Sequence, residues 1–261
     1  MKKLRLHWSD SIKNGRKNFG DWLSPIVCQH ISGREIIHAK PNSADLLAIG
    51  SILQRLKNNF WNSKTIIWGS GFIEEQPRVK TIHQVNALRG KKSAYILKNA
   101  EPMAFGDPGL LADSLLPNYS EIQKKYSLGI VCHYKDATPE IMSLISKKFV
   151  DVKFIDIFSE PFEFMKKINS CELVLSSSLH GLVTADAFGI PNAWLKLSDT
   201  LKGGNFKFED YYSTFDIYPS PLNIEMLNLS TLSKIKDQYQ RNNISAIKKE
   251  LISSFPHNLY K

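Results

Sequence analysis

The segment CELVLSSSLHGLVTADAFGIPNAWLKL, residues 171–197, decides the fold because it contains a complete strand–helix–strand unit. The apolar runs at 171–177 and 192–197 are typical of buried strands. Between them, residues 180–188 have the apolar spacing of a helix, which the following Gly-Ile-Pro ends. Two strands joined by one helix form a right-handed crossover, so this unit predicts two parallel strands with a helix packed on their sheet.

The same alternation recurs along the chain. Apolar runs of strand length lie at residues 3–8, 34–39, 45–50, 64–69, 126–134 and 152–158. They are short and rich in β-branched residues, which is typical of strands buried on both faces of a parallel sheet. Helical patterns lie at residues 21–33, 138–149, 160–169 and 229–255, the last forming one or two helices. Thr138 is expected to cap one helix and Gly33 to end another. We therefore predict an α/β fold.

Residues 107–127 interrupt this alternation with prolines, a glycine and an asparagine. We predict that the segment links two halves of the chain, an N-terminal Rossmann-like domain at residues 1–120 and a C-terminal one at 121–261, which includes the terminal helices. Two open parallel sheets that face each other create a cleft at the carboxyl ends of their strands, where ligands bind in such folds. The functional site is therefore expected in the loops that follow the strands.

The composition is that of an ordinary soluble globular protein, with 43% hydrophobic and 23% charged residues. No apolar run reaches the roughly 18 residues that a membrane span needs. The N-terminal residues 1–21 lack the continuous apolar stretch of a signal peptide, so a cytoplasmic location is expected. The three cysteines, Cys28, Cys132 and Cys171, form no CxxC pair. We expect buried thiols and neither a metal site nor a disulfide framework.

The formal net charge of +9 favours anionic partners such as phosphorylated small molecules or anionic lipid head groups. The positive charges are spread along the chain and do not interleave with aromatic residues as in a nucleic-acid module. We therefore expect no nucleic acid among the partners.

His180 is the first candidate for chemistry. With Ser178 and Leu179 it is predicted to form the turn between a strand end and a helix start, where free N–H groups and the helix dipole attract an anion. Gly181 removes a side chain where a ligand can approach the backbone. The dipole and the net charge lower the pKa of His180, and a bound phosphate or carboxylate raises it again. This balance suits a general acid, and the position equally suits a histidine that merely caps the turn.

A second loop enters a predicted helix at residues 16–23. Asn18, Gly20 and Asp21 there predict a tight turn followed by an N-cap carboxylate. The alternative is an ordinary helix start without a ligand.

Three further loops follow predicted strands or contain a glycine. Gly69, Ser70 and Gly71 permit close backbone approach to an anionic ligand, although this short pattern is not a full dinucleotide fingerprint. Arg89 precedes a glycine, where it is either a bidentate anion ligand or a solvated side chain. His133 lies just past a strand end, at a position expected to face the cleft.

Taken in order, several segments resemble the polysaccharide pyruvyl transferase family. They are NFGDWL, WGSGF, ALRGKKSAYIL, FGDPGLL, LGIVCHYKD and SSLHGLVTADAFGIP. The resemblance runs from about residue 14 to residue 216, and it is most specific at the Leu-His-Gly and Gly-Asp-Pro segments. GGNFKFEDYYSTF, at 203–215, is also similar to a segment of the branch that makes acidic exopolysaccharides.

The resemblance implies two Rossmann-like domains that face a cleft in a GT-B-like arrangement. It implies transfer of the enolpyruvyl carbons of phosphoenolpyruvate to two hydroxyls of a sugar, with release of phosphate and formation of a pyruvate ketal. The acceptor is then a sugar of a surface polysaccharide repeat unit or of its lipid-linked precursor. No cofactor or metal is implied. A basic surface also fits peripheral contact with the inner membrane face.

The resemblance also implies roles for individual residues. His180 corresponds to the histidine of the family's active site and would protonate the methylene carbon of the donor. Arg89 corresponds to an arginine that holds the donor's anionic groups, and His133 to a histidine near the donor or acceptor. The remaining matched residues around the cleft are Asn18, Gly20, Asp21, Gly69, Ser70, Gly71, Leu179 and Gly181.

The chain departs from the family pattern at two positions. Ser178 stands where many members have an arginine, so Lys207 or Arg89 is expected to supply the missing cation. Cys132 stands where proline is usual before the histidine.

Two other functions remain open at this point. One is a glycosyltransferase that uses a nucleotide sugar on the same architecture. The other is a non-catalytic family member that binds an anionic glycan or nucleotide, which the substitution at Ser178 keeps open.

Overall fold

Two parallel sheets organise the computed structural model, which describes residues 3–10, 12–13, 15–59, 61 and 63–260. The first sheet has six strands in the order β4-β1-β5-β6-β7-β8, and every neighbouring pair is parallel. Its strands are β1 (Leu4–His7), β4 (Ile36–His38), β5 (Leu46–Leu47), β6 (Ile66–Trp68), β7 (Gln84–Leu88) and β8 (Ala104–Phe105).

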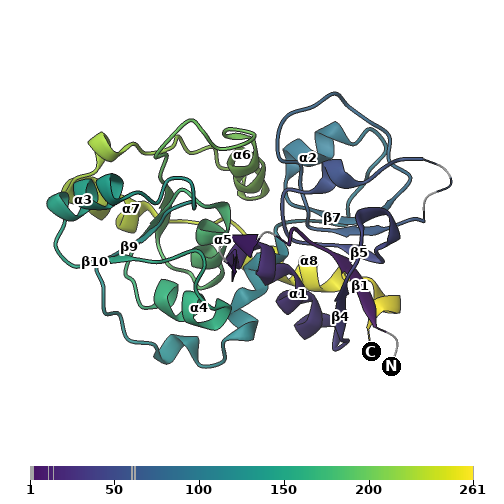
Figure 1. Cartoon of the computed structure of the whole chain (residues 1–261), viewed down its shortest axis with the longest axis horizontal. Helices are drawn as coiled ribbons and strands as arrows, with labels where there is room; N and C mark the ends of the chain where they lie inside the picture. Colours follow the sequence, from purple (N-terminus) through teal and green to yellow (C-terminus); the bar gives the residue numbers. More distant parts are fainter. Residues whose placement is uncertain (1–2, 11, 14, 60, 62, 261) are drawn as a thin grey trace.

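The second sheet has four parallel strands in the order β10-β9-β11-β12. Its strands are β9 (Leu128–Val131), β10 (Val152–Phe154), β11 (Val174–Ser176) and β12 (Asn192–Trp194). A short antiparallel pair, β2 (Ile12–Lys13) and β3 (Arg16–Lys17), precedes the first helix. In Figure 1 the two sheets lie at opposite sides of the molecule, with α1 and α5 between them.

The helices follow the strands as expected for an α/β fold. The α-helices are α1 (Phe19–Ser32), α2 (Lys91–Ile96), α3 (Pro139–Lys148), α4 (Pro161–Asn169), α5 (Leu179–Ala187), α6 (Phe206–Tyr212), α7 (Leu229–Gln238) and α8 (Ile244–Ser253). Short 3-10 helices are η1 (Pro41–Ser43), η2 (Leu53–Arg55), η3 (Pro108–Leu115), η4 (Tyr119–Glu121), η5 (Ser213–Phe215), η6 (Ile224–Met226) and η7 (His257–Leu259). The prediction of an α/β fold with parallel sheets is confirmed.

Each strand predicted from the sequence is present, but the short pair β2 and β3 and the sheet strands β7 and β8 were not predicted. The pattern of β7 is broken by Gln84 and Asn86, which are polar. Asn86 is buried because its side-chain amide donates to the carbonyl oxygen of Ser254 at 2.8 Å. A partner 168 residues away thus permits a polar residue inside a buried strand.

The predicted helix caps are partly correct. Gly33 ends α1 in the left-handed conformation with φ 66°, and Thr138 accepts a hydrogen bond from the backbone N–H of Ile141 at the start of α3. The prediction that Asp21 caps α1 is wrong, because Asn18 is the cap and Asp21 lies in the first turn. The helix after β11 also begins earlier than predicted, at Leu179, so its first turn includes the candidate histidine.

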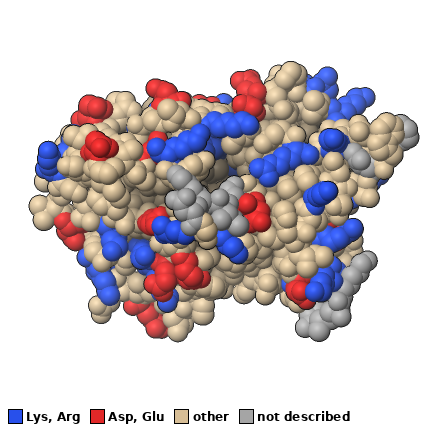
Figure 2. All heavy atoms as spheres, in the orientation of Figure 1, with Lys and Arg blue, Asp and Glu red and all other residues tan. Residues whose placement is uncertain are grey.

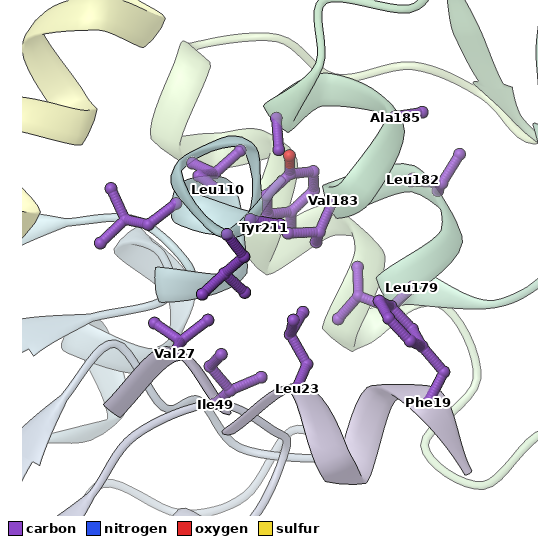
Figure 3. Packing of buried hydrophobic residues seen from close by; sticks show 14 of the residues in the cluster. Phe19, Leu23, Val27, Ile49, Leu110, Leu179, Leu182, Val183, Ala185 and Tyr211 are labelled. Carbon is purple, nitrogen blue, oxygen red and sulfur yellow. The ribbon is translucent and has the colours of Figure 1, made fainter. Parts of the chain in front are cut away.

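The segment predicted as a linker does connect the two sheets, since it runs from β8 to β9. It is not an exposed tether, however, because η3 packs against α1, α5 and α8 and buries Leu110. In Figure 3, Leu23 of α1, Leu110 and Val183 of α5 lie in one apolar cluster. The same cluster extends from Leu4 in the first sheet to Val174 in the second. The division into domains at residue 120 stays a prediction.

A buried ion pair attaches α6 to the turn between β7 and α2. The guanidinium of Arg89 donates to the carboxylate of Asp210 at 2.9 Å, and both side chains are fully buried. Ser93 donates to the same carboxylate through its backbone N–H at 2.8 Å and its hydroxyl at 2.7 Å. Gly90 is required in this turn, since a Cβ there would lie 1.7 Å from the carbonyl oxygen of Asp210.

The last helix returns to the first sheet. The indole N–H of Trp68 in β6 donates to the carbonyl oxygen of Leu251 in α8 at 2.9 Å. Lys248 of α8 donates to the carboxylate of Asp113 in η3 and to the carbonyl oxygen of Ala187 in α5, both at 2.7 Å. The C-terminal helix therefore joins both halves of the chain.

The replacement Asp210→Ala is expected to lower the free energy of unfolding by about 3–5 kcal/mol, because it leaves the buried guanidinium of Arg89 without its counter-charge. The matched control is Glu209→Ala on the same helix, which removes a half-exposed pair with Lys92 and should change stability by less than about 1 kcal/mol. Urea unfolding followed by circular dichroism measures both. Equal losses in the two variants would contradict the central role of the buried pair.

Candidate active site

A pocket of about 470 Å³ lies where loops from the two sheets meet. It is lined by Ser9, Asn18, Asp21, Gly50, Ser51, Ile52, Arg55, Ile73, His133, Tyr134, Lys135, Phe158, Ser178, Leu179, His180, Lys202 and Lys207. Most of these residues follow the carboxyl ends of β1, β5, β9, β10 and β11, which is the expected place for a ligand in parallel α/β folds. Among the residues predicted as site residues, those that line it are Asn18, Asp21, His133, Leu179, His180 and Lys207.

His180 enters the pocket from the first turn of α5, and its side chain is 14% exposed. Its Nδ1 lies against the start of α1, where a Cβ at Gly20 would be only 2.2 Å away. The N–H of Gly20 donates to the side-chain oxygen of Asn18 at 2.9 Å. Gly20 and Asn18 therefore shape the space that the imidazole occupies.

The other ring nitrogen of His180 faces the interior. Its Nε2 lies 3.8 Å from Oδ2 of Asp107, and neither atom has a hydrogen-bond partner among the described residues. Burial, together with the charges of Lys207 and Arg89, lowers the pKa of His180 to about 3. Burial also raises the pKa of Asp107 to about 6. At neutral pH the site therefore holds a neutral imidazole beside an ionised carboxylate.

Asp107 was not predicted as a site residue. Its segment, Gly-Asp-Pro, was one of the two most specific parts of the family resemblance, and that was the available signal. Nothing in the local sequence indicates that its side chain reaches the histidine 73 positions later.

Lys207 brings a positive charge into the pocket from α6. It is 9% exposed and forms no ion pair with any residue that the structure describes. Burial and the neighbouring Arg89 lower its pKa to about 8, although the carboxylate of Asp136 opposes this shift. An ammonium group that is desolvated and unpaired attracts an anion strongly.

The remaining charges around the pocket are mostly positive as well. Arg55, Lys135 and Lys202 also line it, whereas Asp21 is the carboxylate among the residues that line it. Figure 2 shows the face of the molecule on which Lys and Arg side chains border a central hollow. The pocket therefore suits a ligand with more than one negative charge.

Arg89 lies behind the pocket, not in its lining. In addition to the ion pair with Asp210, its guanidinium donates to the hydroxyl of Ser51 and, at 2.6 Å, to the carbonyl oxygen of Phe72. Ser51 lines the pocket, so Arg89 reaches it through this hydroxyl. A direct contact between Arg89 and a donor stays a prediction.

The predicted glycine loop is also placed behind the pocket. A Cβ at Gly71 would lie 2.5 Å from the guanidinium of Arg89, so this glycine makes room for the arginine. The hydroxyl of Ser70 donates to the carbonyl oxygen of Gly50 at 2.7 Å, and Gly69 packs against Pro108. These residues support the loops that line the pocket.

The residues around His180 divide between lining and packing. Leu179 and Ser178 line the pocket. Gly181 does not, since a Cβ there would lie 2.3 Å from the hydroxyl oxygen of Ser176. That glycine permits α5 to pack closely on β11.

His133 lines the pocket from the loop after β9. Its backbone N–H donates to the hydroxyl of Ser177 at 2.8 Å and is therefore not available to a ligand. Its Nδ1 accepts a hydrogen bond from the N–H of Lys135 at 3.3 Å, and its ring lies 4.4 Å from that of Tyr134. The imidazole is therefore held at the rim of the pocket.

Other sequence-based expectations concern cysteines, metals and membranes. All three cysteines are free and buried, as predicted. In the described ranges, no group of three or more His, Cys, Asp or Glu side chains is placed to hold a metal ion. No described helix combines the length and apolar character that crossing a membrane requires.

The chain is similar to two curated proteins. Over 180 residues it is 27% identical to the succinoglycan biosynthesis protein ExoV of Rhizobium meliloti (strain 1021), covering 67% of this chain and 55% of that protein. Over 164 residues it is 32% identical to the uncharacterized protein L143 of Acanthamoeba polyphaga mimivirus, covering 60% of this chain and 56% of that protein. The chain thus spans about half the length of the curated relatives that it matches.

The family model for polysaccharide pyruvyl transferases matches residues 2–199. This match includes β1 through β12 and every pocket residue except Lys202 and Lys207. The chain belongs to the polysaccharide pyruvyl transferase family.

Proposed function

We propose that the protein transfers the pyruvyl group of phosphoenolpyruvate to two hydroxyls of one sugar, forming a pyruvate ketal during polysaccharide biosynthesis. Family membership supports pyruvyl transfer, and the name of ExoV supports a role in making a surface polysaccharide. The observation that carries the proposal is the unpaired, buried Lys207 beside the buried His180 in a pocket whose charged lining residues are mostly cations.

The donor carries a phosphate and a carboxylate, which the cations of the pocket would hold. Lys207 contacts the donor most closely in this proposal, since it is buried and has no other counter-charge among the described residues. The first turn of α5 adds backbone N–H groups that lack helical acceptors. Lys207 thereby supplies the cation that the family resemblance places at the position of Ser178.

His180 would act as the general acid. The negative charge of a bound donor raises the pKa of the imidazole, which burial otherwise depresses. As the first sugar hydroxyl bonds to the central carbon of the donor, His180 gives a proton to the methylene carbon, which becomes a methyl group. The bond from the central carbon to the phosphate oxygen then breaks, and the second hydroxyl bonds to the same carbon. One hydroxyl proton restores His180, and the other leaves with phosphate.

The acceptor would lie toward Asp21 and His133, which also line the pocket. A carboxylate repels an anionic donor and accepts hydrogen bonds from hydroxyls, so Asp21 suits a sugar. Tyr134 and Phe158 also line the pocket, with ring centroids 6.2 Å apart, and offer apolar faces to a sugar ring. The acceptor is a repeat-unit sugar, free or lipid-linked, and the protein acts in the cytoplasm with peripheral contact to the inner membrane face.

The first test replaces the proposed acid. His180→Ala is expected to lower ketal formation by about 100- to 10,000-fold, the range of general acid catalysis, while the fold is retained. Donor labelled with ¹³C at the methylene carbon is incubated with repeat-unit glycans, and NMR detects the methyl carbon of the ketal. Turnover equal to that of the wild type would remove His180 from the chemistry.

The second test concerns donor binding. Lys207→Ala is expected to weaken phosphoenolpyruvate binding by about 1.5–3 kcal/mol, because it removes a charged hydrogen-bond donor from a desolvated site. The control Lys234→Ala removes an exposed lysine of α7 and should leave binding unchanged. Isothermal titration calorimetry measures both variants. Binding of a nucleotide sugar in place of phosphoenolpyruvate by the wild type would instead support a glycosyltransferase.

The third test uses pH. The pKa of Lys207 is lowered to about 8, so its ammonium form is lost as the pH rises above that value. Donor affinity should therefore fall between pH 7 and pH 9.5, with the loss displaced upward to the extent that the bound donor raises this pKa. Lys207→Arg keeps its charge throughout and should bind with an affinity that changes little over the same range. The same fall in both proteins would assign the effect to another group.

A further inference from the structure

Two buried polar atoms face each other at the back of the pocket, and neither has a partner among the described residues. Asp107 is the N-cap of η3, and its Oδ1 accepts the N–H of Gly109 at 2.9 Å. Its Oδ2 makes no hydrogen bond and lies 3.8 Å from Nε2 of His180, which makes none either. Buried polar atoms nearly always have partners, so a facing pair without any indicates a functional arrangement.

We propose that Asp107 is the positioning residue of His180, holding Nε2–H with its free oxygen so that Nδ1 faces the pocket and exchanges the proton. The ring geometry supports this orientation, since Nε2 is buried and faces Asp107, whereas Nδ1 lies against Gly20 and the side chain as a whole lines the pocket. The proposal rests on the proposed function only for the identity of the group that receives the proton.

The position of Asp107 is fixed by close packing. Gly109, two residues later, lies between α5 and α1, where a Cβ would be 2.9 Å from Val183 and 3.0 Å from Leu23. The helices that carry His180 and Gly20 therefore both pack on the segment that carries Asp107, and Figure 3 shows Leu23 and Val183 in this cluster. A small movement of the imidazole suffices to bring 3.8 Å to hydrogen-bond distance.

The charged groups around Asp107 and His180 explain why His180 needs a neighbouring carboxylate in order to act as an acid. Lys207 and Asp210 approach from α6, Arg89 from the turn after β7, Asp21 from α1 and His133 from the loop after β9. Lys207 and, to a smaller extent, Arg89 oppose protonation of the histidine, although the carboxylate of Asp210 pairs with Arg89.

Asp107 provides the opposing negative charge. With its carboxylate ionised, an imidazolium at position 180 gains a counter-ion inside the protein. A donor that neutralises Lys207 removes the repulsion as well. Donor binding and protonation of His180 are therefore coupled, so that His180 is protonated mainly when the donor is bound.

The substitution Asp107→Asn separates positioning from structure. Asparagine still caps η3 through Oδ1, so the fold is retained, but its amide N–H₂ then faces His180 and requires Nε2 to be the acceptor. Long-range ¹H–¹⁵N correlation spectra of the histidine rings are expected to show His180 with the proton on Nε2 in the wild type and on Nδ1 in the variant. His180→Ala identifies its signals.

The control is Asp113→Asn in the same 3-10 helix, which weakens a pair with Lys248 away from the pocket and should leave the tautomer of His180 unchanged. In the wild type, lowering the pH through the pKa of Asp107, about 6, should produce the same tautomer change, because the protonated carboxyl becomes a donor. This second measurement does not depend on any variant folding.

Kinetics provide an independent readout. In Asp107→Asn, kcat is expected to fall by about 100- to 10,000-fold while KM for phosphoenolpyruvate changes by less than about threefold. An unchanged tautomer in the variant and at low pH would overturn the positioning role. A tautomer change in a wild-type protein that neither binds nor converts phosphoenolpyruvate would support the role and refute the proposed function.

Discussion

The buried ion pair between Arg89 and Asp210 is the constraint on which the site depends. Two buried charges are stable together only when their remaining polar atoms also form hydrogen bonds. Here Ser93 donates to the carboxylate, and the carbonyl oxygen of Phe72 accepts from the guanidinium. Because the partners are 121 residues apart, the pair ties α6 to the turn after β7. That attachment holds Lys207, on the same helix, inside the pocket. In the proposed function, the arginine would thus serve anion binding indirectly, by placing a lysine that has no ion-pair partner among the described residues.

The pocket itself holds charges that the protein does not neutralise. Lys207 is cationic without an ion-pair partner among the described residues, and Asp107 and His180 each carry a buried atom without a hydrogen bond. Burying each of these groups without a partner costs free energy. An anionic ligand of the kind proposed would compensate the charge of Lys207 directly, and by favouring the imidazolium form of His180 it would also give Asp107 a hydrogen-bond donor.

Local sequence patterns predicted what depends on local physics. The strand–helix–strand unit at 171–197 was recognised from apolar runs and a glycine stop, and the caps at Thr138 and Gly33 from residue type alone. Interactions between residues far apart in the sequence could not be predicted in this way. The polar Asn86 made β7 unrecognisable as a buried strand, because the partner of its side chain lies near the other end of the chain. The candidate site divides similarly. His180 and Lys207 were predicted and line the pocket, whereas the burial of Arg89 and the approach of Asp107 depend on partners far away in sequence.

Ser178 shows how the charge balance of the pocket constrains its chemistry. The family resemblance places an arginine before Leu-His-Gly, and a second permanent cation there would lie beside His180. Since Lys207 and Arg89 already lower the pKa of that imidazole, another cation would oppose its protonation further, unless the ligand neutralised both. In the proposed reaction, a serine removes this repulsion and leaves donor binding to a lysine with a pKa of about 8. On this proposal the site lacks one permanent positive charge, so that donor binding would be sensitive to alkaline pH and His180 would be easier to protonate.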